Sequence, residues 1–205
     1  NEGIGLRIGA YGGGVSDTLK FHLENIRINN HSHTPFSRPD KGDGTSMQIR
    51  VLHNVNKPVY GKIVNLEITD GTIDNIDPFW GDYPYAHFTY GSDKDVYERK
   101  LYLINSTIGN NTAVNRNHGG GMMFNGCVDA YIINSIIYGN TPDNLTVFNH
   151  YNHPMDIHFI HSILEGGVNN VKYYGNANAN IHWREGSMDV DPLWVGENDF
   201  GIYPY

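Results

Sequence analysis

Aromatic rings and carboxylates are concentrated in one stretch of the chain, residues 74–99. Trp80, Asp82, Tyr83 and Tyr85 lie at its centre. Sugar rings have apolar C–H faces bordered by hydroxyls, so aromatic side chains beside carboxylates suit a glycan. These four residues are therefore our candidate glycan-binding residues. The other interpretation, that the aromatics form a small core for a long inserted loop, stays open.

A second inserted segment, residues 31–45, contains Asp40-Lys-Gly-Asp-Gly-Thr45. Asp40 and Asp43 could offer oxygen ligands to calcium, the one cofactor that the sequence suggests. The segment lacks the later acidic ligands of an EF-hand loop. We favour an Asp/Gly-rich turn over a calcium site.

Eleven histidines raise the question of a transition metal. His150 and His153 are three residues apart, as are His158 and His161. In a strand this spacing places two side chains on opposite faces, unless the chain bends between them. With no third ligand in view, the sequence predicts no metal site.

No catalytic constellation recurs along the chain. A polysaccharide lyase needs a basic residue and a group that neutralises the uronate, and a glycosidase needs two placed carboxylates. The best cluster, Arg116 and His118 near Asp129, is weak, and the family resemblance given below implies that Asp189 and Asp191 cap turns. We predict no catalytic residues. A non-catalytic protein is favoured, with a carbohydrate-active enzyme as the alternative.

A repeat must position all of these residues. Five segments align without gaps around a central polar residue, which is Asn25, Asn65, Asn105, Asn134 or His161. Two positions before it and three positions after it the residue is always apolar, and five after it stands a turn former. The apolar residues two before the centre are Leu23, Ile63, Leu103, Ile132 and Phe159.

The period of this motif breaks at the central residue. After the centre, apolar or small residues alternate with a step of two, as in a strand. Across the centre the step is three, so both sides can face inward only if the chain bends there. Asn tolerates the left-handed conformation of a sharp bend, and stacked Asn side chains can form a hydrogen-bonded ladder.

Successive centres are 40, 40, 29 and 27 residues apart, which fits stacked coils with two inserted loops. Further strand-like runs occur between the repeats at 6–11, 47–52, 86–90, 121–124 and 145–149. We therefore predict an all-β right-handed parallel β-helix of about five to seven coils. It should form a single domain over residues 1–205, as a segment of a longer chain. A β-sandwich explains the five in-register bends poorly.

Composition sets the limits on function. Charged residues make up 18% of the 205 residues, and 14 Lys and Arg against 22 Asp and Glu give a net charge of −8. A basic footprint for nucleic acid is absent, and no apolar run is long enough for a membrane span. The single cysteine, Cys127, rules out an intrachain disulfide framework.

Two stretches resemble the secreted right-handed parallel β-helix repeat proteins of bacteria. They are Gly119-Gly-Gly-Met-Met-Phe124 with Tyr131-Ile-Ile-Asn-Ser-Ile-Ile-Tyr-Gly-Asn-Thr141, and His161-Ser-Ile-Leu-Glu-Gly-Gly167 with Asp189-Val-Asp-Pro-Leu-Trp194. The resemblance implies an exported cell-surface or extracellular protein, an adhesion-type scaffold with a polysaccharide or cell-surface glycan as partner. Self-association through the ends of the solenoid is a further expectation.

Overall fold

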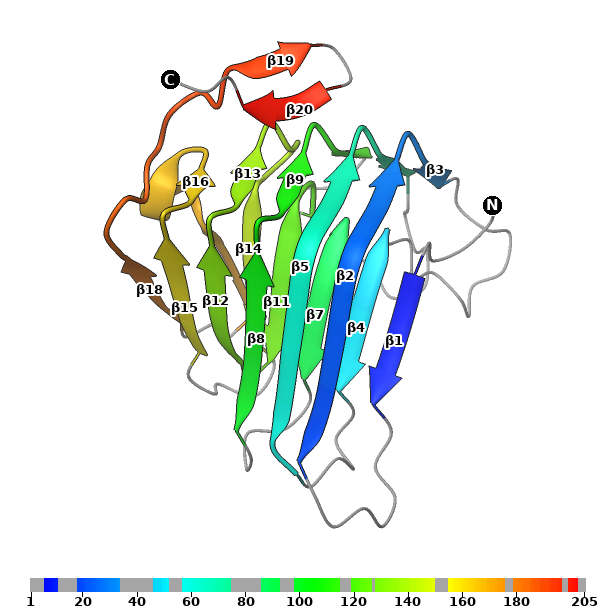
Figure 1. Cartoon of the computed structure of the whole chain (residues 1–205), viewed down its shortest axis with the longest axis vertical. Helices are drawn as coiled ribbons and strands as arrows, with labels where there is room; N and C mark the ends of the chain where they lie inside the picture. Colours follow the sequence, from blue (N-terminus) through cyan, green and yellow to red (C-terminus); the bar gives the residue numbers. More distant parts are fainter. Residues whose placement is uncertain are drawn as a thin grey trace.

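The chain folds into stacked sheets of mostly parallel β-strands (Figure 1). The computed structural model describes residues 6–10, 18–33, 46–51, 57–74, 86–92, 98–114, 119–126, 128–149, 155–175, 179–196 and 199–202. Within these ranges there is no α-helix, and the one helical element is a short 3₁₀ turn, η1 (Gly167–Asn170). This all-β, mostly parallel architecture is compatible with a parallel β-helix.

Sheet one contains the predicted bends. Its strands before or across the bend are β2 (Leu19–Asn29), β5 (Val59–Thr69), β8 (Arg99–Ile104), β12 (Asp129–Ile133), β15 (Met155–Ile160) and β18 (Ala179–Trp183). After the bend follow the short strands β9 (Thr107–Gly109), β13 (Ile136–Tyr138) and β16 (Ile163–Leu164). Every pair in this sheet is parallel.

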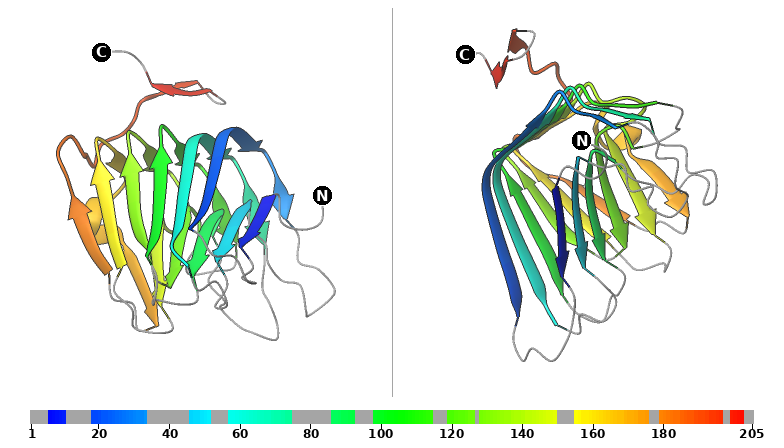
Figure 2. Two further views of the ribbon diagram at one scale, coloured as in Figure 1. Left: turned by 60° about the horizontal axis from the view of Figure 1, so that its bottom comes forward. Right: turned by 90° about the vertical axis from the view of Figure 1, so that its right-hand side faces the viewer.

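Sheet two is built from the second set of strand-like runs. Its order is β1 (Leu6–Ala10), β4 (Met47–Val51), β7 (Phe88–Ser92), β11 (Met122–Gly126), β14 (Leu145–Asn149) and β17 (Lys172–Gly175). The five predicted runs are thus confirmed to within a few residues, and β17 is an addition. Sheet three is small, with β3 (Ser32–His33), β6 (Thr72–Asp74) and β10 (Thr112–Val114). Figure 2 shows sheets one and two as two layers in which successive strands lie side by side along the stack.

The chain turns at two left-handed corners in each repeat. The predicted bend residues all have positive φ: Asn25 57°, Asn65 56°, Asn105 51°, Asn134 48° and His161 49°. The turn formers five residues later are left-handed as well: Asn30, Asp70, Asn110, Gly139 and Gly166. Asn, Asp and Gly adopt this conformation at low cost, which explains why these residue types recur at the corners.

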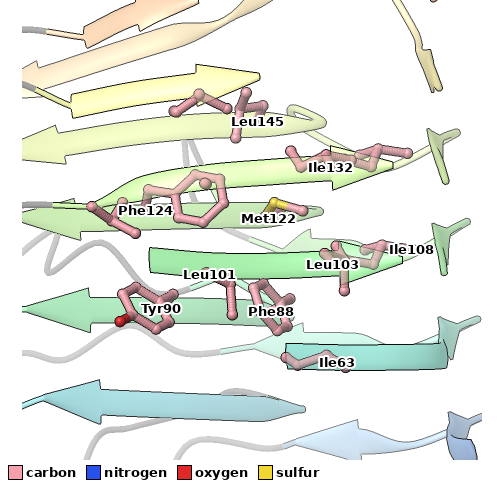
Figure 3. Packing of buried hydrophobic residues seen from close by; sticks show 14 of the residues in the cluster. Ile63, Phe88, Tyr90, Leu101, Leu103, Ile108, Met122, Phe124, Ile132 and Leu145 are labelled. Carbon is pink, nitrogen blue, oxygen red and sulfur yellow. The ribbon is translucent and has the colours of Figure 1, made fainter. Parts of the chain in front are cut away.

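The predicted interior column exists. Leu23 pairs in register with Ile63, Ile63 with Leu103, Leu103 with Ile132 and Ile132 with Phe159. From Ile63 to Phe159 these side chains are at most 1% exposed. Figure 3 shows members of the column facing Phe88, Met122, Phe124 and Leu145 of sheet two. Because alternate residues of both sheets point inward, neither sheet buries its apolar face without the other.

An inner asparagine ladder also joins the coils. The Asn111 amide donates to Asn140 Oδ1 (2.9 Å), and the Asn140 amide donates to Asn144 Oδ1 (2.8 Å). The same amides reach the carbonyls of Ile68 and Ile108 (2.9 and 2.8 Å). All three Asn side chains are buried, so each hydrogen bond satisfies a group that water cannot reach.

The glycine run 119–121 lets neighbouring backbones approach closely. A Cβ on Gly120 would lie 2.4 Å from the Thr141 carbonyl oxygen, and one on Gly121 would lie 2.5 Å from that of Asn144. The Gly119 and Gly120 amides both donate to Asp143 Oδ1 (2.9 and 3.3 Å). The glycine run therefore allows adjacent strands to pack closely where side chains would not fit.

The last described residues lie beyond the stack. The antiparallel pair β19 (Trp194–Gly196) and β20 (Asp199–Ile202) sits outside the parallel sheets in every view (Figures 1 and 2). Among the described residues, no helix has the length and apolar character needed to cross a membrane.

Candidate functional site

The loop residues singled out from the sequence lie outside the described residues. This applies to the glycan candidates Trp80, Asp82, Tyr83 and Tyr85, and to the calcium candidates Asp40 and Asp43. Arg116, His118, Cys127, His150 and His153 fall outside them as well. Phe88 and Tyr90, two aromatics of the same 74–99 stretch, are core residues of β7 with no exposed surface.

The turn-capping interpretation of the late aspartates is confirmed. Asp189 Oδ1 accepts a hydrogen bond from the Gly166 amide at 2.7 Å. Asp191 Oδ1 accepts one from the Leu193 amide at 2.9 Å, where Leu193 has a φ of 52°. Both carboxylates thus hold backbone turns.

The outer face of sheet one carries the described polar and aromatic side chains that could bind a ligand. In β8, β12 and β15 buried residues alternate with partly exposed ones, as expected for strands with one face on a core. In-register pairing then stacks the outward residues into two adjacent columns. We call these two columns together the outer stripe. The first column consists of Lys20, Tyr60, Lys100, Asp129, Asp156 and Asn180. The second column consists of His22, Lys62, Tyr102, Tyr131, His158 and His182.

Four rings of the second column stack face to face. The ring centroids of Tyr102 and Tyr131 are 4.9 Å apart, those of Tyr131 and His158 are 4.6 Å apart, and those of His158 and His182 are 4.2 Å apart. The interplanar angles are 13°, 9° and 9°. Because each ring covers the face of its neighbour, the stack offers ring edges, phenol groups and imidazole nitrogens to a ligand.

The charge of the first column changes sign along the stack, from Lys20 and Lys100 to Asp129 and Asp156. Lys100 forms an ion pair with Glu98, which also accepts a hydrogen bond from the Tyr60 hydroxyl. Asp129 follows Lys100 in the column and precedes Asp156. Burial, and then the negative charge of Asp156, raises the pKa of Asp129 above the usual value.

Asp156 has the opposite shift. Its Oδ1 atom lies 2.5 Å from His182 Nε2 and 3.3 Å from Asn180 Nδ2. The hydrogen bond from His182 is the main reason why the pKa of Asp156 is lowered. Two neighbouring carboxyl groups therefore have pKa values pushed in opposite directions, a pattern typical of acid–base pairs.

Three groups of the outer stripe could hold a metal ion. Asp156, His158 and His182 each offer one ligand atom, and these atoms lie within 4.8 Å of one another. Burial is the first cause that lowers the pKa of His158, followed by the charges of His182 and Arg184. The imidazole of His158 is thus biased toward its neutral, metal-binding form.

A serine between two histidines lies inside the fold. Ser46 Oγ is 2.8 Å from His87 Nδ1 and 2.5 Å from His31 Nε2. His87 Nε2 is 3.3 Å from the Thr112 carbonyl oxygen, which only accepts, so in a neutral His87 ring Nε2 carries the proton and Nδ1 accepts the Ser46 hydroxyl proton. A nucleophile–base pair has this geometry, but Ser46 and His87 are both 0% exposed. The network therefore connects coils and has no access to a substrate.

Comparisons of the chain with protein-family models, with curated proteins and with solved structures found no match.

Sequence reasoning missed the outer stripe for a specific reason. His158 pairs with His182 of the next coil, whereas His161, three residues away in the sequence, lies after the end of β15 at a left-handed corner. Trp183 pairs with Phe159 and so continues the interior column. Phe159 stands two residues before its positive-φ corner residue, His161, whereas Trp183 stands three residues before the next one, Gly186. This extra residue hides the sixth copy from a gap-free alignment. An alignment that allowed one insertion would have revealed it.

Proposed function

We propose that this chain is a right-handed parallel β-helix of an exported cell-surface protein, and that its outer stripe binds glycans without catalysis. Support for the β-helix comes from in-register parallel pairing, from two recurring left-handed corners and from the shared interior column. Right-handed connections between parallel strands are the rule in proteins, which supports the handedness.

The outer stripe is the observation that carries glycan binding. It places hydroxyl, carboxylate, ammonium, amide and imidazole groups in two straight columns on a rigid sheet. Parallel strands repeat every ~4.8 Å, so the stripe offers similar groups at regular steps. An extended polysaccharide presents its hydroxyls at regular steps along one direction too, and the two can match over several units.

The test is binding of polysaccharides to the wild-type protein and to Tyr131→Ala. Tyr131 lies in the middle of the stack, between Tyr102 and His158. Loss of its hydroxyl and ring should reduce the binding free energy by about 1.4 kcal/mol, which corresponds to tenfold weaker binding. Tyr173→Ala is the matched control, because Tyr173 is an exposed tyrosine of β17 in sheet two.

A glycan array followed by calorimetry on the best ligand gives the measurement. Binding that is weakened by Tyr131→Ala and unchanged by Tyr173→Ala supports the stripe. Equal binding by both variants, or no binding of any polysaccharide on the array, overturns it. A triple alanine variant of Trp80, Tyr83 and Tyr85 tests the loop as the alternative glycan-binding surface.

A carbohydrate-active enzyme is the second candidate. The specific observation in its favour is the neighbouring pair Asp129 and Asp156, whose pKa values move apart, next to Lys100. Incubation with polyuronates and neutral polysaccharides, compared with Asp129→Asn, is the test. New reducing ends or unsaturated products that the variant fails to make would establish catalysis, and their absence counts against it.

Export and self-association belong to the same proposal. The resemblance to secreted β-helix repeat proteins supports export, and cell fractionation of the native source would check it. Trp183 and Tyr173 leave 36% and 47% of their surface exposed in the last coil of sheets one and two, which favours contact with another surface. Size-exclusion chromatography at several concentrations would detect the self-associated form.

A further inference from the structure

The Asp156, His158 and His182 cluster brings together two adjacent strands of sheet one. Asp156 and His158 are two residues apart in β15, so both point to the outer face. His182 of β18 stands directly opposite His158 in the parallel register. Figure 1 shows β15 and β18 side by side at one end of the stack.

The ligand set matches a definite class of cation. Two imidazoles and one carboxylate suit zinc, copper and nickel, whereas calcium and magnesium prefer oxygen ligands. Three protein ligands with a position open to water form the usual open zinc site. All three side chains are partly buried, so solvent can reach a fourth position.

The separations need only a small adjustment. Tetrahedral ligands at about 2.1 Å from zinc lie roughly 3.4 Å from one another. Asp156 Oδ1 and His182 Nε2 are 2.5 Å apart, and all three ligand atoms fall within 4.8 Å. A cation placed between them takes over the role of the hydrogen in the Asp156–His182 contact. Rotation of the His158 ring about its side-chain bonds brings in the third nitrogen.

Neighbouring groups already orient the ligands. Tyr131 stacks on His158 at 4.6 Å, and the Asn180 amide donates to Asp156 Oδ1 at 3.3 Å. Such contacts around ligands limit their rotation and raise metal affinity. The parallel backbone ladder between β15 and β18 fixes the strands that carry them.

We propose that Asp156, His158 and His182 form a binding site for a divalent transition-metal cation of the zinc class on the outer face of sheet one. The site lies within the outer stripe, but the glycan-binding role proposed above is tested at Tyr131, which is not one of the three metal ligands. Either can fail without the other.

The experiment is zinc chloride titration of the whole chain by calorimetry, for wild type and for Asp156→Asn, His158→Gln and His182→Gln. We expect one zinc per chain at this site and at least tenfold weaker binding in each variant. His22→Gln is the matched control, because His22 lies in the same outer column with a carboxylate, Glu24, 3.9 Å away, but forms no three-ligand cluster with other described residues. This control should bind zinc like the wild type. Unchanged zinc binding in all three site variants overturns the proposal.

Two further measurements keep the test decisive if a variant folds poorly. Zinc should protect His158 and His182 of the wild-type protein from diethyl pyrocarbonate, as read by peptide mass spectrometry. Equal modification with and without zinc refutes the site. Calcium chloride at millimolar concentration should leave bound zinc in place, and displacement of zinc by calcium contradicts the assigned ligand class.

Discussion

The inner asparagine ladder should contribute far more to stability than the outer ladder of bend residues, in which the Asn65 amide donates to Asn25 Oδ1 and the Asn134 amide donates to Asn105 Oδ1. Asn140→Leu keeps the approximate volume of the side chain but removes its hydrogen bonds. Four buried partner atoms then lose a contact: the amide nitrogens of the Asn111 backbone and side chain, the Ile108 carbonyl oxygen and Asn144 Oδ1. At roughly 1 kcal/mol for each lost hydrogen bond, the free energy of unfolding should fall by about 4 kcal/mol.

Urea unfolding followed by circular dichroism measures this loss. With a slope of about 2–3 kcal/mol per molar urea, the midpoint should fall by roughly 1.5 M. Asn134→Gly is the matched control, because Asn134 is exposed, has a φ of 48° that glycine accepts, and donates one side-chain hydrogen bond to Asn105. That control should lose at most about 1 kcal/mol. Equal losses in the two variants would refute the claim that the buried ladder joins the coils.

Two other predictions concern backbone approach and charge. Gly121→Ala forces a Cβ to within 2.5 Å of the Asn144 carbonyl oxygen, so the free energy of unfolding should fall by about 2 kcal/mol or more. Gly91→Ala should change it little, because a Cβ there would stand 4.0 Å from its nearest neighbour, the Ile49 carbonyl oxygen. Thermal unfolding of both variants checks this, and similar melting temperatures would contradict it. Asp129→Asn should raise the melting temperature at pH 7, because the raised pKa of Asp129 means that its charged form is disfavoured in the folded state. This gain in stability should shrink as the pH falls through the raised pKa and should vanish below the pKa of the unfolded state, about 3.9. A variant that is less stable than the wild type at pH 7 would show the reasoning to be wrong.

The bend-centred motif predicted much of the fold because it states geometry directly. A step of three between Leu23 and Ile26 and a step of two between Ile26 and Ile28 require a corner at Asn25, and that residue has a φ of 57°. The predicted ladder of bend asparagines is confirmed between two pairs of neighbouring repeats, where the Asn65 amide donates to Asn25 and the Asn134 amide donates to Asn105. Local residue types carry this information, so no knowledge of the neighbouring coil is needed.

The inner ladder could not be read in the same way. Six residues after the bend, the five copies have His31, Gly71, Asn111, Asn140 and Gly167, so no single residue type is shared by all five copies. Gly71 is small because two imidazoles fill the space beside it, with His31 Cε1 only 2.4 Å from where a Cβ would stand. Such complementarity between coils appears only once the register is known.

The metal cluster was hidden by the same dependence on register. His158 and His182 are 24 residues apart, and the repeat aligns them only when one inserted residue before Gly186 is allowed. The aromatic loop and the Asp40 and Asp43 segment remain predictions, because they lie outside the described residues.

Corner spacing is constant in this molecule, whereas the number of residues per coil is not. The two left-handed corners are five residues apart in all five copies, while in-register partners are separated by 40, 40, 29 and 27 residues. The extra residues of the longer repeats therefore lie between the second corner of one repeat and the bend residue of the next. The spacing between paired strands does not change with their number. Natural variation or an engineer could lengthen that path to display a new peptide while the corners keep every coil in step.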